Sequence, residues 1–159
     1  MNETELAYTS AVDLAAMIRK RDVSPVEVAE LFLTRIKASQ PALNAFLAIA
    51  GERAVAEARA AEAMVMRGGA DLPPLLGVPY TVKDLIDTEG VRTTYASLAL
   101  ADNIPAADGV TVARMKQSGA VMLAKTTTPE FGHKPMNEAP IFGKTHNPWD
   151  LQRTCGGSS

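Results

Sequence analysis

The stretch that decides the fold runs from residue 76 to residue 84 and reads Leu76-Gly77-Val78-Pro79-Tyr80-Thr81-Val82-Lys83-Asp84. Its middle, residues 78–82, consists mainly of β-branched and aromatic residues, which favours a β-strand. Farther along the chain, a helix is predicted between Asp108 and Gly119, and residues 121–124 are a second apolar strand candidate. A strand, a helix and a strand in this order are typical of a parallel sheet, so the sequence predicts an α/β fold.

The residues upstream of this stretch are predicted to form three helices. Ser10 can cap a first amphipathic helix that ends near Lys20, because apolar residues recur at helical spacing after it. Ser24, followed by proline and later by glutamate, is a second helix start. A third helix should run from about Glu52 to Arg67, where two glycines stop it.

The chain is expected to form a single truncated domain with two regions. Residues 1–70 are the helical N-terminal region, and residues 71–159 begin the α/β core, in which helices flank a mixed or parallel sheet. Residues 135–159 are rich in proline, glycine and asparagine and show no sustained hydrophobic period. We therefore expect a loop over this last segment.

The bulk composition excludes several classes of partner. The 16 basic and 18 acidic side chains give a formal net charge of −2 and form no basic stripe, so nucleic acid is not expected as a direct partner. Residues 1–10 show neither a signal peptide nor a membrane anchor. Cys155, the single cysteine, forms no internal disulfide and belongs to no zinc-binding pattern. The sequence therefore predicts a cytoplasmic protein that uses no metal and no other cofactor.

Lys83 directly follows the first predicted strand, at the edge where the ligands of open α/β sheets usually bind. A lysine serves as a general base only where burial or a neighbouring cation lowers its pKa enough to free the amine. A lysine at the end of a strand is also commonly a solvated charge. The position of Lys83 alone leaves both interpretations open.

The last four residues read Gly156-Gly157-Ser158-Ser159. Two glycines leave the backbone unhindered beside two hydroxyl groups, which suits a loop that must approach a reacting group closely. The same composition is typical of a flexible linker. These residues alone leave both interpretations open.

Taken together, the ordered motifs resemble those of the amidase-signature family. Residues 76–84 resemble the strand that presents the family's catalytic lysine, and residues 140–150 and 154–159 resemble the approach to its Gly-Gly-Ser-Ser-Gly-Gly signature and the first part of it. Two residues depart from the family pattern, because Thr127 stands where many relatives have asparagine and Cys155 where proline is common. The segments that match, in chain order, are residues 24–27, 43–46, 76–84, 109–115, 119–132, 140–150 and 154–159.

The resemblance implies the N-terminal part of the amidase-signature fold and a Ser-cisSer-Lys mechanism for the hydrolysis of amide bonds. Lys83 would be the base, and Ser158 would be the bridging serine that relays a proton between Lys83 and a second, nucleophilic serine farther along the chain. The substrate-loop positions that the resemblance implies are Thr127, Gly132, His133 and Gly157.

The sequence ends one residue after Ser158, so we expect an incomplete fragment that lacks the nucleophile and has no amidase turnover of its own. The parent protein would be a cytoplasmic amidase that acts on carbon–nitrogen bonds, other than peptide bonds, of a small-molecule amide. Whether it is a homodimer stays open, as does the identity of the amide. Two alternatives also stay open: the amidase (A) subunit of a glutamyl-tRNA(Gln) amidotransferase, and a non-catalytic remnant, natural or engineered.

Overall fold

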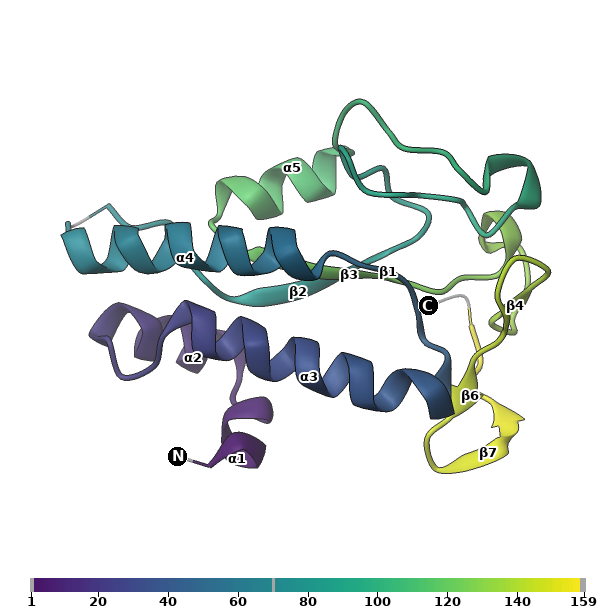
Figure 1. Ribbon diagram of the computed structural model, residues 1–159, viewed down its shortest axis with the longest axis horizontal. Coiled ribbons are helices and arrows are strands. Elements are labelled where there is room, and N and C mark those ends of the chain that lie inside the picture. The colour runs from purple at the N-terminus through teal and green to yellow at the C-terminus, as the bar shows by residue number, and fades with distance from the viewer. Residues whose placement is uncertain (1, 70, 158–159) are drawn as a thin grey trace. The chain divides into compact units, whose positions relative to one another are not determined.

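The computed structural model describes residues 2–69 and 71–157 and is shown in Figure 1. The chain divides into two compact units. The first unit consists of Met1–Arg35, Ala50–Tyr80 and Ala113–Leu123, and the second of Ile36–Ile49, Thr81–Val112 and Ala124–Ser159. The expected boundary near residue 70 stays a prediction.

Helices make up most of the first half of the described residues, and most of the strands lie in the second half. The helices are α1 (Glu3–Ala7), α2 (Ala11–Lys20), α3 (Pro25–Leu43), α4 (Gly51–Arg67) and α5 (Val110–Gln117), with 3-10 turns η1 (Leu98–Leu100) and η2 (Glu130–Gly132). The strands are β1 (Phe46–Ile49), β2 (Pro79–Lys83), β3 (Val121–Thr126), β4 (Glu138–Ala139), β5 (Gly143–Lys144), β6 (His146–Asn147) and β7 (Asp150–Thr154). Among the helices of the described residues, none combines the length and the apolar character needed to cross a bilayer.

The predicted signals for the three N-terminal helices are confirmed. Ser10 Oγ accepts a hydrogen bond from Asp13 N at 3.2 Å and caps α2. At the start of α3, Ser24 Oγ accepts a hydrogen bond from Val26 N at 3.0 Å. Helix α4 ends at Arg67, and the residue that caps it, Gly68, has a φ of 71°. These signals are readable from the sequence because caps and glycine stops act within a few residues.

The hydrophobic core of the first unit forms where α2, α3 and α4 meet the segment before β2. Its buried members are Leu6, Leu14, Ala15, Ile18, Val23, Val28, Ala61, Val65, Leu76 and Val78. Gly77 lies in this segment with a φ of 78°, and a Cβ atom there would lie 2.9 Å from Pro25 Cβ. The chain therefore approaches the start of α3 this closely only because residue 77 has no side chain.

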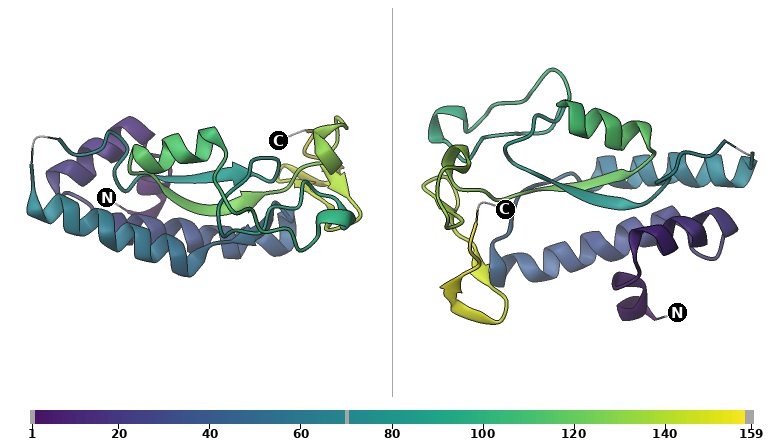
Figure 2. Two further views of the ribbon diagram at one scale, coloured as in Figure 1. Left: turned by 90° about the horizontal axis from the view of Figure 1, so that it is seen from above. Right: turned by 180° about the vertical axis from the view of Figure 1, so that it is seen from behind.

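Strand β3 is the middle strand of a three-stranded sheet with the order β1-β3-β2, and the further views in Figure 2 show β2 and β3 side by side. Strand β1 is antiparallel to β3. Val121 N donates to Val78 O at 2.8 Å and Asp84 N donates to Thr126 O at 3.0 Å, so β2 and β3 run in the same direction. The sheet is therefore mixed, and α5 connects its parallel pair, which confirms the predicted α/β class.

The expectation of a loop over residues 135–159 is wrong for part of this segment. Strand β4 pairs antiparallel with β5, and β6 pairs antiparallel with β7. The partners are close neighbours in the sequence. Strands β4, β5 and β6 have two residues each, too few to show the alternation of apolar and polar residues that identifies a strand, and all five residues of β7 are exposed. The sequence of this segment therefore indicates its turns but not its strands.

Candidate active site at the end of strand β2

Lys83 is the last residue of β2 and is half-buried. The backbone turns immediately after it, since Lys83 O accepts a hydrogen bond from Ile86 N at 3.1 Å. Asp84 N donates to Thr126 O at 3.0 Å, which fixes the start of this turn to β3. The structure places Lys83 at the carboxyl end of its strand, where the sequence puts it, and its role as a base stays a prediction.

The side chain of Asp84 is fully buried and holds the loop that follows β2. Its Oδ2 accepts hydrogen bonds from Thr94 N at 3.0 Å, from Thr94 Oγ1 at 2.6 Å and from Ala96 N at 3.4 Å. Tyr95 and Ala96 have positive φ angles of 54° and 57°, a conformation that persists only where the surroundings enforce it. The carboxylate of Asp84 supplies that constraint next to Lys83.

Lys125, in β3, is a second lysine at this end of the sheet, and it is not predicted as a site residue from the sequence. It is fully buried, and its Nζ donates hydrogen bonds to Ile86 O and, at 3.1 Å, to Thr88 Oγ1. Burial lowers the pKa of Lys125 to about 8, against the opposing effect of the Asp84 and Asp87 carboxylates. Its side chain therefore fastens the turn after β2 to β3.

Tyr95 and Phe131 connect the loop after β2 with the loop after β3. Their rings stack with centroids 6.1 Å apart and an interplanar angle of 29°, and Phe131 N donates to Tyr95 O at 2.9 Å. Tyr95 OH donates to Asp87 Oδ1 at 2.6 Å, and this hydrogen bond, together with burial, raises the pKa of Tyr95 to about 12. The hydroxyl therefore stays protonated near neutral pH and acts as a donor.

A buried polar network connects the end of β3 with the loop that contains Gly156 and Gly157, here called the glycine loop. Asn137 Nδ2 donates to Thr127 O at 3.3 Å and to Thr127 Oγ1 at 2.9 Å. Asn137 N donates to Gly156 O at 2.9 Å. The sequence alone does not indicate this role of Asn137, because an asparagine in a turn-rich segment is ordinarily a turn residue. Ser158, the predicted bridging serine, lies outside the described residues.

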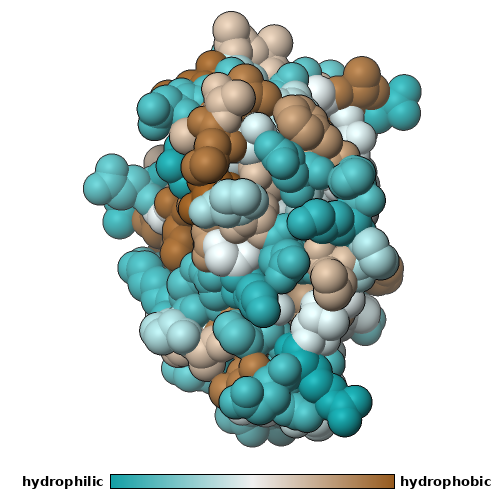
Figure 3. Space-filling model, turned by 90° about the vertical axis from the view of Figure 1, so that its right-hand side faces the viewer, coloured by the Kyte–Doolittle hydropathy of each residue, from teal (hydrophilic) through white to brown (hydrophobic). Residues whose placement is uncertain are grey.

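The predicted substrate-loop residues lie on the segment after β3 and on the glycine loop. Gly132 ends η2 with a φ of 70°, and the exposed His133 follows it. Gly157 is exposed, whereas Thr127 is buried. Figure 3 shows that hydrophilic and apolar side chains are interspersed on the face at the right-hand side of Figure 1. Contact between these four residues and a substrate stays a prediction.

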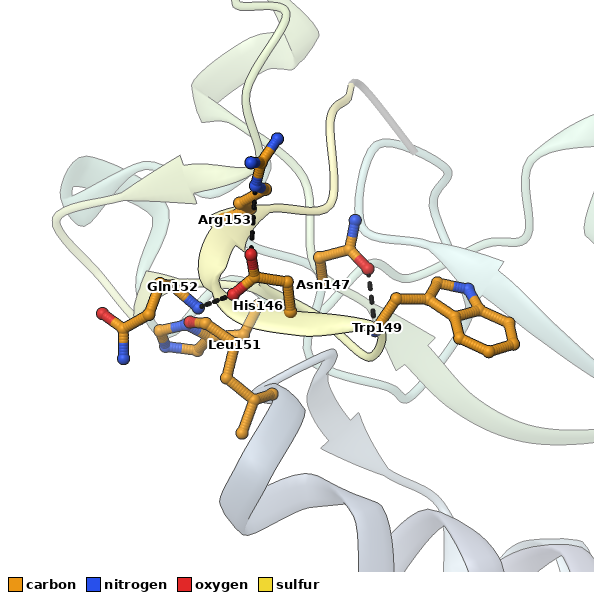
Figure 4. Close-up of polar contacts among 7 residues, drawn as sticks. His146, Asn147, Trp149, Leu151, Gln152 and Arg153 are labelled. Atoms are coloured by element: carbon orange, nitrogen blue, oxygen red, sulfur yellow. Dashed lines mark hydrogen bonds and ion pairs between the residues drawn. The ribbon is translucent and has the colours of Figure 1, made fainter.

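The hairpin of β6 and β7 precedes the glycine loop and is held by local polar contacts (Figure 4). His146 Nδ1 lies 2.8 Å from Leu151 O, and Asp150 Oδ2 accepts a hydrogen bond from Arg153 Nε at 3.0 Å. The ring of Trp149 points away from the hairpin and the residue is 94% exposed.

In residues 2–69 and 71–157, no group of three or more His, Cys, Asp or Glu side chains is arranged to hold a metal ion.

Known proteins resemble this chain in sequence. The family described as Amidase matches residues 27–159. The chain is 47% identical over 150 residues to the A subunit of the glutamyl-tRNA(Gln) amidotransferase of Azoarcus sp. (strain BH72), a match that covers 94% of the chain and 30% of that relative. It is 38% identical over 159 residues to an acylamidase of Rhodococcus erythropolis, a match that covers 100% of the chain and 33% of that relative.

Solved structures resemble the chain in fold as well. A bacterial aryl acylamidase of the amidase signature enzymes family superimposes with a TM-score of 0.89 at 29% sequence identity, over 96% of this chain and 32% of that protein. The chain thus spans about a third of the length of the relatives that it matches.

Proposed function

The chain belongs to the amidase-signature family, and on this premise we propose that the whole protein hydrolyses carbon–nitrogen bonds, other than peptide bonds, in small-molecule amides. The proposed mechanism is of the Ser-cisSer-Lys type, with Lys83 as the base and Ser158 as the bridging serine. Because the chain spans about a third of its relatives, the reaction is proposed for the whole protein and the nucleophilic serine is expected outside these 159 residues.

One observation carries this proposal. The backbone carbonyl groups of Thr126 and Thr127 accept hydrogen bonds from the segments that lead to Lys83 and to Ser158. Thr126 O accepts a hydrogen bond from Asp84 N, directly after Lys83. Thr127 O accepts one from Asn137 Nδ2, and Asn137 N in turn holds Gly156 O. Segments that are far apart in the sequence are thus tied to one strand end, which supports joint action of Lys83 and Ser158.

In the proposed reaction, Lys83 accepts a proton that Ser158 relays from the nucleophilic serine. The activated serine oxygen forms a bond to the amide carbonyl carbon, and the carbon–nitrogen bond breaks as the leaving amine takes up a proton. Water then hydrolyses the acyl-enzyme and releases the acid. The hydroxyl relay takes the place that histidine has in the Ser-His-Asp triad.

Substitutions at the two residues in the whole protein test this mechanism. We expect Lys83→Ala and Ser158→Ala each to lower kcat by about 10²- to 10⁴-fold, because each removes one step of the proton transfer. Lys134→Ala, at an exposed lysine, serves as the control and should keep its rate. The assay uses aryl, aliphatic and glutamine amides. A variant of Lys83 or Ser158 that works at the natural rate removes that residue from the mechanism.

A second candidate function is favoured by the identity of 47% to the A subunit of an amidotransferase. A protein of this kind would act with partner chains, whereas an amidase that works alone, as a monomer or a homodimer, would not. Purification of the whole protein from its native source distinguishes the two, because stably bound partner chains support the amidotransferase. A protein that cleaves no amide and binds no partner would instead be a non-catalytic remnant.

We place the protein in the reducing cytoplasm because the sequence has one cysteine.

A further inference from the structure

We propose that Asn137 is a positioning residue for Ser158, because its buried amide holds the glycine loop against the end of β3. This inference rests on the proposed role of Ser158 in the relay. Asn137 touches no reacting atom in this scheme and acts on the reaction through the loop alone.

The backbone of Asn137 is in direct contact with the glycine loop. Asn137 N donates to Gly156 O at 2.9 Å, and Asn137 O accepts a hydrogen bond from Thr145 N at 3.0 Å. A Cβ atom on Gly157 would lie 3.2 Å from Met136 C and 3.3 Å from Asn137 N. The glycine loop therefore packs on the backbone of residues 136–137 at a distance that a side chain at residue 157 would disturb.

The side chain of Asn137 anchors that backbone to the sheet. It is 3% exposed, and its Nδ2 donates to Thr127 Oγ1 at 2.9 Å and to Thr127 O at 3.3 Å. Since a carbonyl oxygen only accepts hydrogen bonds, the nitrogen of the amide must be the atom that faces Thr127.

Thr127 is itself held from two sides, so the anchor point is firm. Its backbone N–H donates to Ala45 O at 3.0 Å, and its Oγ1 lies 2.8 Å from Thr145 Oγ1. Thr145 Oγ1 in turn donates to Asn44 O at 2.8 Å. Three segments of the chain, around residues 44–45, 127 and 145, thus fix the position that Asn137 transmits to the glycine loop.

The side-chain oxygen of Asn137 accepts no hydrogen bond within the described part of the chain. Asn137 Oδ1 is buried, and no donor in residues 2–69 or 71–157 reaches it. A buried acceptor without a donor is unfavourable. The contacts that the Nδ2 atom and the backbone of Asn137 make must therefore offset this cost, which indicates that the network around Asn137 is a strong one.

The loss of this anchor should change the rate of the chemical step more than substrate binding. A displacement of about 1 Å at a reacting group costs up to about 100-fold in rate. We expect Asn137→Ala in the whole protein to lower kcat by about 10- to 100-fold and to leave KM within about twofold. Asn103→Ala is the matched control, because Asn103 Nδ2 also donates to a backbone carbonyl, Thr93 O at 2.8 Å, away from the glycine loop.

The decisive measurement combines Asn137→Ala with Ser158→Ala. If Asn137 acts only through Ser158, the double variant has the same residual kcat as Ser158→Ala alone, since residues that act as a unit are not additive. Independent losses that multiply overturn the inference, and so does a natural kcat in Asn137→Ala. A natural kcat in Ser158→Ala is a different result, because it refutes the proposed mechanism itself.

A pair of variants at Thr127 covers the case in which Asn137→Ala does not fold. Thr127→Val removes the hydroxyl that accepts from Asn137, whereas Thr127→Ser keeps it. We expect kcat to fall further in Thr127→Val than in Thr127→Ser, with both thermal unfolding midpoints recorded. Equal kcat in the two variants contradicts the anchor.

Discussion

At the scale of single residues, two lysines at the same end of the sheet have different surroundings. Lys83 ends β2 and is half-buried, whereas Lys125 is fully buried and has its pKa lowered to about 8. The charge of a buried lysine is a cost to the folded state, so Lys125 couples the stability of the protein to pH.

The free energy of unfolding should rise with pH because of Lys125. Its pKa of about 8 in the folded state lies below the ordinary value of 10.5, so between these pH values the unfolded chain binds more protons and alkali favours the fold. Between pH 7.5 and pH 10 we expect the natural chain to gain about 1–3 kcal/mol relative to Lys125→Met. Denaturant unfolding of both chains measures this difference.

Lys134→Met, at an exposed lysine, is the control for this experiment and should show no such difference. The range stops at pH 10 because Tyr95, whose pKa is raised to about 12, works in the opposite direction above that pH. Identical pH dependence in the natural chain and in Lys125→Met would refute the role given to burial.

Local signals explain which site residues the sequence predicts. Lys83 lies inside a strand motif of nine residues, so its place at the strand end is readable from its neighbours. The importance of Lys125 and Asn137 depends on partners elsewhere in the chain, such as Ile86 O for Lys125 and Gly156 O for Asn137. No pattern among adjacent residues reports such contacts, so the sequence could not predict the burial of either side chain.

At the scale of elements, helix starts depend on residues that are near neighbours in the sequence, whereas strand pairing depends on residues that are far apart. The start of α2 depends on two residues three positions apart, Ser10 and Asp13, and is therefore visible in the sequence. Strand β1 pairs through Phe46 with Thr126, which is far away in the chain. The apolar run over residues 45–49 does not indicate which strand it pairs with.

Gly77 provides a prediction for the packing of elements. Its φ of 78° disfavours any side chain, and a Cβ atom would lie 2.9 Å from Pro25 and 3.3 Å from Ile18 Cδ1. We expect Gly77→Ala to lower the free energy of unfolding by about 1–3 kcal/mol. Gly51→Ala is the control, because residue 51 begins α4 with nothing within 4 Å of its Cβ position. Equal unfolding midpoints for the two variants would contradict this account.

At the scale of the whole molecule, each compact unit is assembled from three separate segments. In the first unit, the segment Ala113–Leu123 completes the contacts of the residues before β2. Leu75 N donates to Ser118 O at 2.8 Å, and Gly77 N donates to Gly119 O at 2.9 Å. The N-terminal half of the sequence therefore does not contain all of this unit.

A chain cut after Tyr80 should consequently lose cooperative unfolding. It keeps α1 to α4 but lacks the segment that pairs with residues 75–78. We expect its thermal transition, followed by circular dichroism, to be broader and to lie at a lower temperature than that of the 159-residue chain. A sharp transition at the same midpoint would show that the first unit does not need residues 113–123.

The adjacent carbonyl groups of Thr126 and Thr127 have a mechanical consequence. One receives the N–H that follows Lys83, and the other receives the amide of Asn137. The segment after Lys83 and the segment of Asn137 are attached to two successive residues, so a small displacement of this end of the sheet moves both segments together. The distance between the two segments then stays the same. Only a change within one of the two segments, beyond its attachment point, alters the distance between Lys83 and Ser158 on which proton transfer would depend.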